Sequence, residues 1–307
     1  MSFTLAHLSD PHLAPLPPVR MGDLMNKRLT GYINWLRKRR FVHDPHVLER
    51  LMADLKAQGP NHIAVTGDIA NLALAGEFTR GRDWLEKLGP PQDVSFVPGN
   101  HDIYVKEGES FSLHHWGRYM GGDDGRTGFP YVRRRGPLAI IGLSSGLPTA
   151  PFMATGKIGA RQLAALGPLL EVQKMEGFFR VVLVHHPPVS QARPHRRLLD
   201  ADLLRQALAR HGAELLLHGH DHLAMLNRID GPEGSPIPAV GVPSASAAPG
   251  RGAEAAAYNL YRIDGRANRW TCEMISRGIS SNGNIVEVKR MTLDHLLDLS
   301  SPEPGRL

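Results

Sequence analysis

Side chains that can bind metal ions follow the end of almost every short apolar run in this chain of 307 residues. In chain order they are Asp10, His12, Asp68, Asn100, His101, His185, His220 and His222. Imidazole nitrogens and carboxylate or amide oxygens are ligands that suit manganese, iron or zinc. Because ligands gather at the carboxyl ends of strands in open α/β sheets, we expect these distant residues to meet in one crevice.

The number and types of these side chains indicate two metal ions rather than one. Two divalent ions about 3.5–4 Å apart clamp a phosphoryl group and lower the pKa of a bound water. Such a pair needs a shared carboxylate to offset its repulsion. His220 and His222, with one residue between them, can serve different ions. Gly67, Gly99 and Gly219 would let the backbone approach the site closely.

Strand-like and helix-like segments alternate along most of the chain, which predicts an α/β fold. Strands are expected at residues 3–8, 62–66, 94–97, 131–134, 138–143, 180–184, 214–217, 239–242, 258–263, 270–275 and 285–290. Helices are expected at residues 44–58, 75–88, 159–172 and 198–210. We interpret residues 1–290 as one layered domain with a mostly parallel sheet and a second, mixed sheet, followed by a C-terminal tail at 291–307.

The segment at residues 20–40 interrupts this alternation. It has seven basic residues against one acid, Asp23, and its apolar side chains recur at helical spacing. We predict an inserted basic amphipathic helix. It can pack on its own domain as a cap, or bind a membrane surface or a lipid substrate through its apolar face and cations. Contact with nucleic acid is a third interpretation.

The composition limits where the protein works and what it binds. The net charge of +6 is compatible with phosphorylated substrates, an anionic membrane or nucleic acid, and it does not distinguish between these three classes of partner. The single cysteine, Cys272, excludes an internal disulfide framework and a thiolate metal cluster. No apolar run approaches about 18 residues, and the N-terminus does not read as a signal peptide. We therefore expect a cytoplasmic protein, with peripheral membrane contact through residues 20–40 as an alternative.

Five short blocks occur in an order that resembles the calcineurin-like metallophosphoesterase family. They are Asp10-x-His12, Gly67-Asp68, Gly99-Asn100-His101-Asp102, His185-x-Pro187 and Gly219-His220-x-His222. Together they span about 210 residues, and the resemblance covers roughly residues 3–265. It implies a four-layer α-β-β-α sandwich, with helices outside two packed mixed sheets.

The resemblance also implies a role for each residue. Asp10, His12 and His222 would hold the first metal, Asn100, His185 and His220 the second, and Asp68 would bridge them. His101 would be catalytic, stabilising charge on the phosphate or protonating the leaving oxygen. Asp102 would orient His101 through a carboxylate–imidazole hydrogen bond. We regard His186 as a supporting or packing residue, because it faces the other way if the strand continues.

We therefore expect a metal-dependent phosphohydrolase that cleaves a phosphodiester or pyrophosphate bond by attack of a metal-bound hydroxide. One alternative substrate is a lipid-linked diphosphate at the membrane surface, by similarity to the UDP-diacylglucosamine pyrophosphatases. Nucleic acid is not expected as a partner, since no separate DNA-binding domain follows. A non-enzymatic scaffold on the same fold is the alternative from another class. The natural substrate, the native metals and the oligomeric state stay open.

Overall fold

A computed structural model describes residues 2–267 and 269–293 of the chain, and it contains two six-stranded sheets. The first has the strand order β12-β11-β10-β1-β2-β3. Its strands are β1 (Phe3–Leu8), β2 (His62–Val65), β3 (Val94–Phe96), β10 (Ala257–Arg266), β11 (Arg269–Ile279) and β12 (Ile285–Thr292). β1, β2 and β3 run parallel, whereas β10, β11 and β12 pair antiparallel, so the sheet is mixed.

The second sheet is also mixed and has the order β4-β5-β6-β7-β9-β8. The expected mostly parallel sheet is therefore wrong, because the antiparallel C-terminal strands extend the first sheet instead of forming a sheet of their own. The strands of the second sheet are β4 (Tyr131–Arg135), β5 (Leu138–Gly142), β6 (Phe179–Leu183), β7 (Leu215–His218), β8 (Met225–Asp230) and β9 (Pro236–Gly241). The four strands β5, β6, β7 and β9 run parallel, and β4 and β8 pair antiparallel at the two edges.

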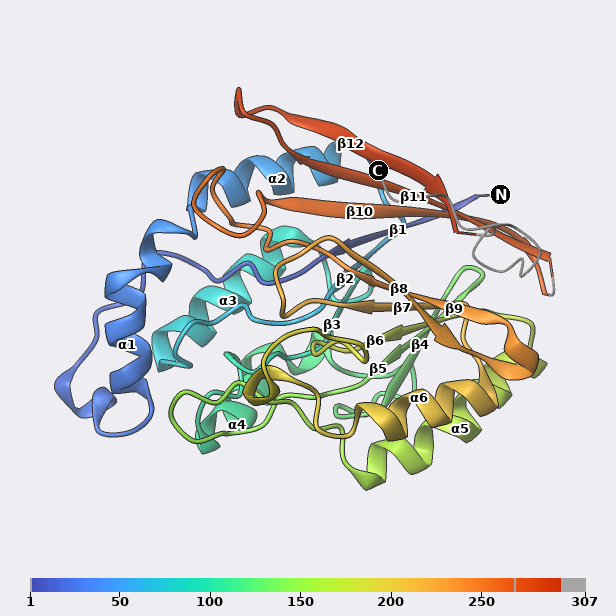
Figure 1. Cartoon of the computed structure of the whole chain (residues 1–307), viewed down its shortest axis with the longest axis horizontal. Helices are drawn as coiled ribbons and strands as arrows, with labels where there is room; N and C mark the ends of the chain where they lie inside the picture. Colours follow the sequence, from blue (N-terminus) through green and yellow to red (C-terminus); the bar gives the residue numbers. More distant parts are fainter. Residues whose placement is uncertain (1, 268, 294–307) are drawn as a thin grey trace.

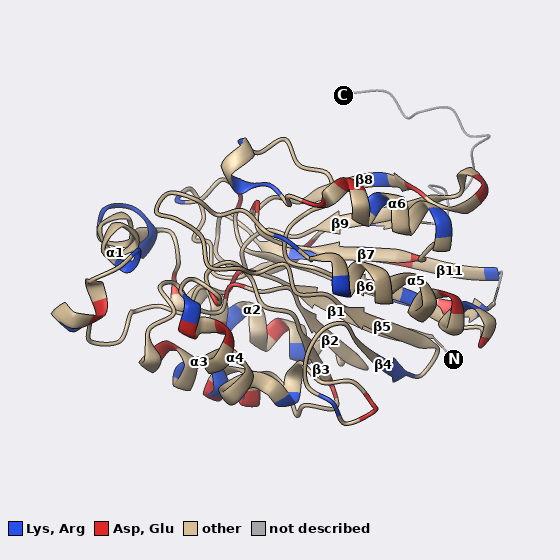
Figure 2. Ribbon diagram, turned by 90° about the horizontal axis from the view of Figure 1, so that it is seen from below, with Lys and Arg blue, Asp and Glu red and all other residues tan. Residues whose placement is uncertain are grey.

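Helices cover the outer faces of the two sheets (Figures 1 and 2). The first sheet is covered by α2 (Pro45–Ala57), α3 (Ala75–Leu88) and α4 (Lys106–Trp116), and the second by α5 (Ala160–Met175) and α6 (Ala201–His211). α2 begins where the sequence predicts, because the Asp44 carboxylate accepts the His46 backbone N–H at 2.8 Å and Pro45 fits the first turn. The architecture is the expected α-β-β-α sandwich, so the predicted fold class is confirmed.

The main apolar core lies between the two sheets. Leu5, Val65 and Phe96 from the first sheet share one buried cluster with Val181 and Leu217 from the second. A second cluster joins the other face of the second sheet to α5 and α6. Because this core holds both sheets rigidly, the loops that leave the parallel strands have fixed starting points.

The inserted segment is shorter as a helix than the sequence predicts. α1 covers only Arg28–Arg37, between two single helical turns at Met21–Leu24 and Arg39–Phe41. No side chain caps the start of α1, and none of its residues is fully buried, although Tyr32 packs partly against the main core. We call residues 20–41 the arm. Its helix α1 lies at one end of the layered body (Figure 1), where Arg28 donates to the backbone carbonyls of Leu72 and Ala73.

Two elements lie where no helix or strand is expected, α4 and β8. α4 has Gly108, two serines and few apolar residues, so it lacks the periodic stripe that predicts a helix. At the other end of the chain, β12 continues to Thr292, and most of the predicted tail at 291–307 lies outside the described residues.

Candidate metal centre

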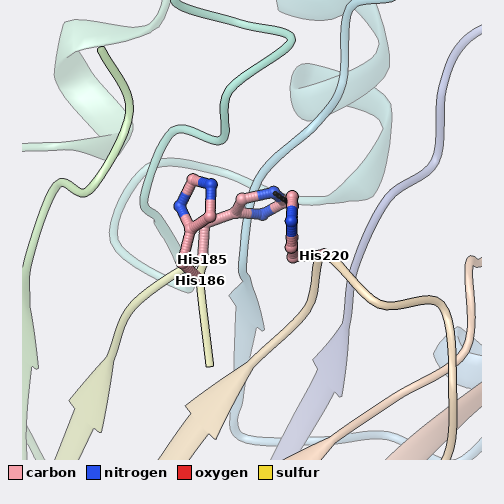
Figure 3. A group of neighbouring side chains, drawn as sticks. All are labelled: His185, His186 and His220. Atoms are coloured by element: carbon pink, nitrogen blue, oxygen red, sulfur yellow. Dashed lines mark hydrogen bonds between the residues drawn. The ribbon is translucent and has the colours of Figure 1, made fainter. Parts of the chain in front are cut away.

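The candidate ligands leave the same edge of the two sheets. Asp10 and His12 follow β1, Asp68 follows β2, and Asn100 follows β3. His185 follows β6, and His220 and His222 follow β7. Figure 3 shows His185 and His220 side by side, although 35 residues separate them in the chain. The structure therefore brings all seven predicted metal ligands together.

One group of side chains contains Asp10, His12 and His222. His222 Nε2 lies 3.1 Å from Asp10 Oδ1 and 3.3 Å from His12 Nε2. The other ring nitrogen of His12, Nδ1, lies 3.1 Å from the backbone carbonyl of Ala70. That contact directs Nε2 of His12 toward the carboxylates and away from the core.

A second group contains Asn100, His185 and His220. His185 Nε2 lies 3.3 Å from both Asn100 Oδ1 and His220 Nδ1. His185 Nδ1 faces the backbone carbonyl of Thr66 at 2.6 Å, so Nε2 is again the nitrogen presented to the site.

Asp68 lies between the two groups. Its Oδ2 is 3.8 Å from His12 Nε2 on one side and 3.4 Å from His185 Nε2 on the other. Its Oδ1 accepts the His101 backbone N–H at 2.7 Å, which fixes the carboxylate plane. A buried carboxylate in this place can contact two cations at once.

The backbone at the site is strained. Eight non-glycine residues among those described have positive φ, and five are candidate ligands: Asp10, His12, Asp68, His220 and His222. Left-handed conformations cost about 1–3 kcal/mol each and gather at functional sites, where the fold imposes them. The strain therefore marks this edge independently of the ligand chemistry.

Burial and neighbouring charges set the protonation states of the donor atoms. Burial alone would raise the pKa of Asp68, but His185 and His101 outweigh it and hold that pKa well below the usual value. Burial lowers the pKa of His12 and His220 well below the usual value, so both rings are neutral. Burial also opposes protonation of His185, yet Asp68 raises its pKa to about 10. A bound cation would replace that proton.

The residues present fit two divalent ions. The donors are nitrogen and oxygen atoms, and they form two groups around one carboxylate. The neighbouring backbone also leaves room for them, since a Cβ on Gly219 would lie 1.9 Å from Ser9 Oγ and 2.5 Å from Asp10 Oδ2. Any larger residue there would push Asp10 out of its position.

Comparison with known proteins agrees with this geometry. The family model described as calcineurin-like phosphoesterase matches residues 3–224. The chain belongs to the calcineurin-like phosphoesterase family. No curated protein matches the sequence of this phosphoesterase.

Solved structures share the fold of this phosphoesterase at low sequence identity. A dimetal phosphatase from Danio rerio superposes with a TM-score of 0.59 and 14% identity, over 94% of this chain and 98% of that chain. A purple acid phosphatase from yellow lupin seeds gives a TM-score of 0.53 and 12% identity, over 99% of this chain and 57% of that one. These likenesses support the architecture of the phosphoesterase.

His101 lies beside the ligands of the phosphoesterase. Its Nδ1 faces the backbone carbonyl of Asn71 at 2.6 Å, and its ring stacks on Tyr104 with centroids 5.4 Å apart. Burial first, and then the charge of Arg39, lower its pKa to about 3, so the ring is neutral. Nε2 of His101 therefore carries a lone pair.

The predicted hydrogen bond from Asp102 to the His101 ring is wrong. The Asp102 carboxylate instead accepts the backbone N–H groups of Asp68, Ala70 and Gly99 at 2.7–2.9 Å. Burial first, and then the charge of Asp68, raise its pKa to about 7. Because the turn after β3 directs Asp102 into the protein, it supports the loops that carry Asp68 and Asn100 and does not touch the imidazole.

Asp102→Ala is expected to lower the free energy of unfolding by at least about 3 kcal/mol, since it leaves three buried N–H donors unpaired at about 1–3 kcal/mol each. Asp102→Asn keeps one acceptor oxygen and should lose less. Urea denaturation of the metal-free proteins measures this. If Asp102→Ala lost turnover while its free energy of unfolding stayed unchanged, Asp102 would have a catalytic role instead.

Two site residues were missed by sequence reasoning, Arg39 and His43. The Arg39 side chain reaches from the arm to the ligands, with Nη2 2.8 Å from His12 Nε2 and Nη1 2.8 Å from His101 Nε2. His43 packs its ring 4.5 Å from the His12 ring. Nothing in the sequence separates Arg39 from the six other basic residues of its segment.

His186 is close to the second group but has other partners. Its Nδ1 lies 2.8 Å from Ser145 Oγ, and its Nε2 lies 3.2 Å from the backbone carbonyl of Ala154. Figure 3 shows its ring next to those of His185 and His220. We therefore assign His186 a supporting role, although its distance would allow it to bind a metal.

Proposed function

We propose that this phosphoesterase hydrolyses a phosphodiester or pyrophosphate bond with two divalent ions, of manganese, iron or zinc. The observation that carries the proposal is the position of Asp68 between two groups of imidazole nitrogens and carboxylate or amide oxygens. Two such ions, when bound, clamp a phosphoryl group and activate water for attack.

The residues of the chain would have the roles that the resemblance to the family implies. One ion would be held by Asp10, His12 and His222, the other by Asn100, His185 and His220, and Asp68 would be shared. His101 turns Nδ1 to the Asn71 carbonyl, and Nε2 can carry a proton for the leaving oxygen once the negative charge of a bound phosphate raises the low pKa of the ring. Asn71 and Tyr104 orient that ring by a carbonyl contact and by stacking.

The test combines two measurements on one preparation. Elemental analysis after purification with added manganese should find about two metal ions per chain. Hydrolysis of bis(p-nitrophenyl) phosphate should exceed that of p-nitrophenyl phosphate, since the proposal names a diester or anhydride bond. Metal with turnover of the monoester alone would contradict that bond type. Neither metal nor turnover would favour the non-enzymatic scaffold.

A specific observation favours a lipid-linked substrate as the second candidate function. The arm exposes Met21 and Met25 to 84% and 88%, and Phe41 also lies open to solvent. The same segment has seven basic residues, some of which colour α1 blue in Figure 2, and apolar residues beside cations are typical of helices that lie in a membrane interface. No helix among the described residues is long and apolar enough to span a membrane. A cytoplasmic location remains a prediction from the sequence.

Replacing both Met21 and Met25 by aspartate is expected to reduce binding to vesicles that contain phosphatidylglycerol by at least about tenfold, because two apolar anchors are lost and two like charges face the lipid. Vesicle sedimentation measures this. Met175→Asp is the matched control, because Met175 is 78% exposed on α5, away from the arm. Equal binding of all three proteins would leave the arm as a cap only.

A further inference from the structure

Arg39 is a cation without a carboxylate partner at the centre of the site. Its guanidinium lies against two neutral rings: Nη2 is 2.7 and 2.8 Å from Nδ1 and Nε2 of His12, and Nη1 is 3.0 and 2.8 Å from Nδ1 and Nε2 of His101. Among the described residues, no ion pair of Arg39 with an acidic side chain is found. A guanidinium has five donors and binds anionic oxygens in pairs, so neutral imidazoles leave most of its capacity unused.

The cavity that Arg39 enters has more cations on its rim. It has a volume of about 610 Å³ and lies over the candidate ligands. Lys38, Arg39, Arg196 and Arg251 line it, and Asp221 is the one carboxylate among its described lining residues besides Asp68. Asp221 already accepts the Ser190 hydroxyl at 2.8 Å. The rim is therefore built for an anion.

The cations approach the two halves of the site from opposite sides. Arg39 contacts His12 and His101. Arg196 instead lies beside the second group, where its Nη2 donates to the backbone carbonyl of His220 at 3.3 Å and its own carbonyl faces His220 Nε2 at 2.8 Å. A ligand that meets both arginines must carry anionic oxygens at both ends of the cavity.

Charge balance favours more than one phosphate. Two divalent ions would bring four positive charges, whereas Asp10 and Asp68 supply only two negative charges. The rim adds four cationic side chains and one further carboxylate, Asp221. A phosphodiester brings one negative charge, whereas two linked phosphates bring two or three. An ion held by Asp10, His12 and His222 would repel the positively charged guanidinium of Arg39. A phosphate between the ion and the guanidinium would offset this repulsion.

We propose that Arg39 is a substrate-binding residue that binds the attacked phosphate of a diphosphate, and that Arg196 binds the second phosphate. This inference rests on the proposed function. In the reaction, the oxygen of water forms a bond to one phosphorus and the bridging P–O bond breaks. The bridging oxygen leaves on the other phosphate, and the two protons of water end on the products or on solvent. Arg39 donates hydrogen bonds throughout and transfers no proton.

The experiment measures binding, so it does not depend on turnover. Wild-type protein, Arg39→Ala and Arg39→Lys are loaded with manganese, and their metal content is measured. Methylenebisphosphonate, whose bridge cannot be hydrolysed, and inorganic phosphate are then titrated calorimetrically. Arg40→Ala is the matched control, because Arg40 is the next residue, is exposed and stacks on Phe41.

Wild-type protein is expected to bind the bisphosphonate at least about tenfold more tightly than phosphate. Arg39→Ala should weaken bisphosphonate binding by about 10- to 100-fold, the loss typical of a hydrogen bond to a charged group, with unchanged metal content. Arg39→Lys should recover only part of it, because an ammonium cannot form the paired contact. Arg40→Ala should bind as the wild type does.

Each contrary result has a separate meaning. Loss of metal in Arg39→Ala, equal bisphosphonate affinity of Arg39→Ala and wild type, or no preference of wild type for the bisphosphonate over phosphate would each overturn this inference alone. A wild-type protein that holds no metal would overturn the proposed function as well. Hydrolysis assays with a soluble nucleoside diphosphate ester and with a lipid-linked diphosphate in vesicles then show which kind of diphosphate is the substrate. Hydrolysis of neither compound would also overturn the inference.

Discussion

Asp68→Asn is expected to remove metal binding and hydrolysis together. The substitution keeps the side chain's size, and its carbonyl oxygen can still accept the His101 backbone N–H, so the loop after β2 should hold its shape. The other position, now an amide that carries two hydrogens, would face His12 and His185. An N–H donor cannot contact a cation, and the negative charge that offsets two ions is gone.

The expected loss is large because Asp68 serves both groups. Removing a partner that only orients a ligand costs about 10- to 100-fold in metal affinity, so losing a shared ligand should cost more than about 100-fold. Elemental analysis and hydrolysis of bis(p-nitrophenyl) phosphate measure both effects. Asp83→Asn, an exposed acid on α3, is the control. An Asp68→Asn protein that retained two metals would disprove the shared position.

His101→Ala is expected to keep both metals and to lower kcat by about 10²- to 10⁴-fold, the usual contribution of a positioned proton donor. The ring touches the ligand groups only at their edge, 5.1 Å from the His12 ring, and the backbone N–H that binds Asp68 remains. Metal content and KM should therefore change little.

The dependence of the rate on the leaving group tests whether His101 donates a proton. If His101 gives a proton to the departing oxygen, its loss should slow a diester with a poor alkoxide leaving group more than one with p-nitrophenolate. Pairs of such substrates compared in the wild type and His101→Ala measure this difference. His114→Ala on α4 is the control, because that ring is exposed. Metal loss in His101→Ala, or equal slowing of both substrates, would assign the ring another role.

The sequence predicts the ligand groups well because of the topology. Parallel strands send their carboxyl ends to one edge of a sheet, so residues such as Asp10 and Asp68, which follow neighbouring strands, can be placed together from strand order. His185 comes from the other sheet and joins them because the two sheets pack face to face. The Asp102 contact was mispredicted because the role was carried over from the resemblance to the family. Adjacent side chains in a tight turn point in different directions, and the turn after β3 sends Asp102 toward buried N–H groups.

Arg39 shows a second limit of sequence reasoning. Its segment was expected to be one continuous helix, in which seven cations would be distributed around the surface. The helix ends at Arg37, and the following turn redirects the chain so that one guanidinium enters the site. No periodic pattern encodes such a change of direction, because it depends on where the arm meets the body.

The left-handed backbone at Asp10, His12, Asp68, His220 and His222 has a consequence for how the protein survives without metal. The core holds these residues in a costly conformation, and the ligand histidines crowd one another around two carboxylates. Bound ions would relieve the crowding and would stabilise the folded state, because they bind it and not the unfolded chain. Folding and metal supply are then thermodynamically linked, so a metal-starved cell would hold less of this protein, because the empty chain would be the first to unfold and be degraded.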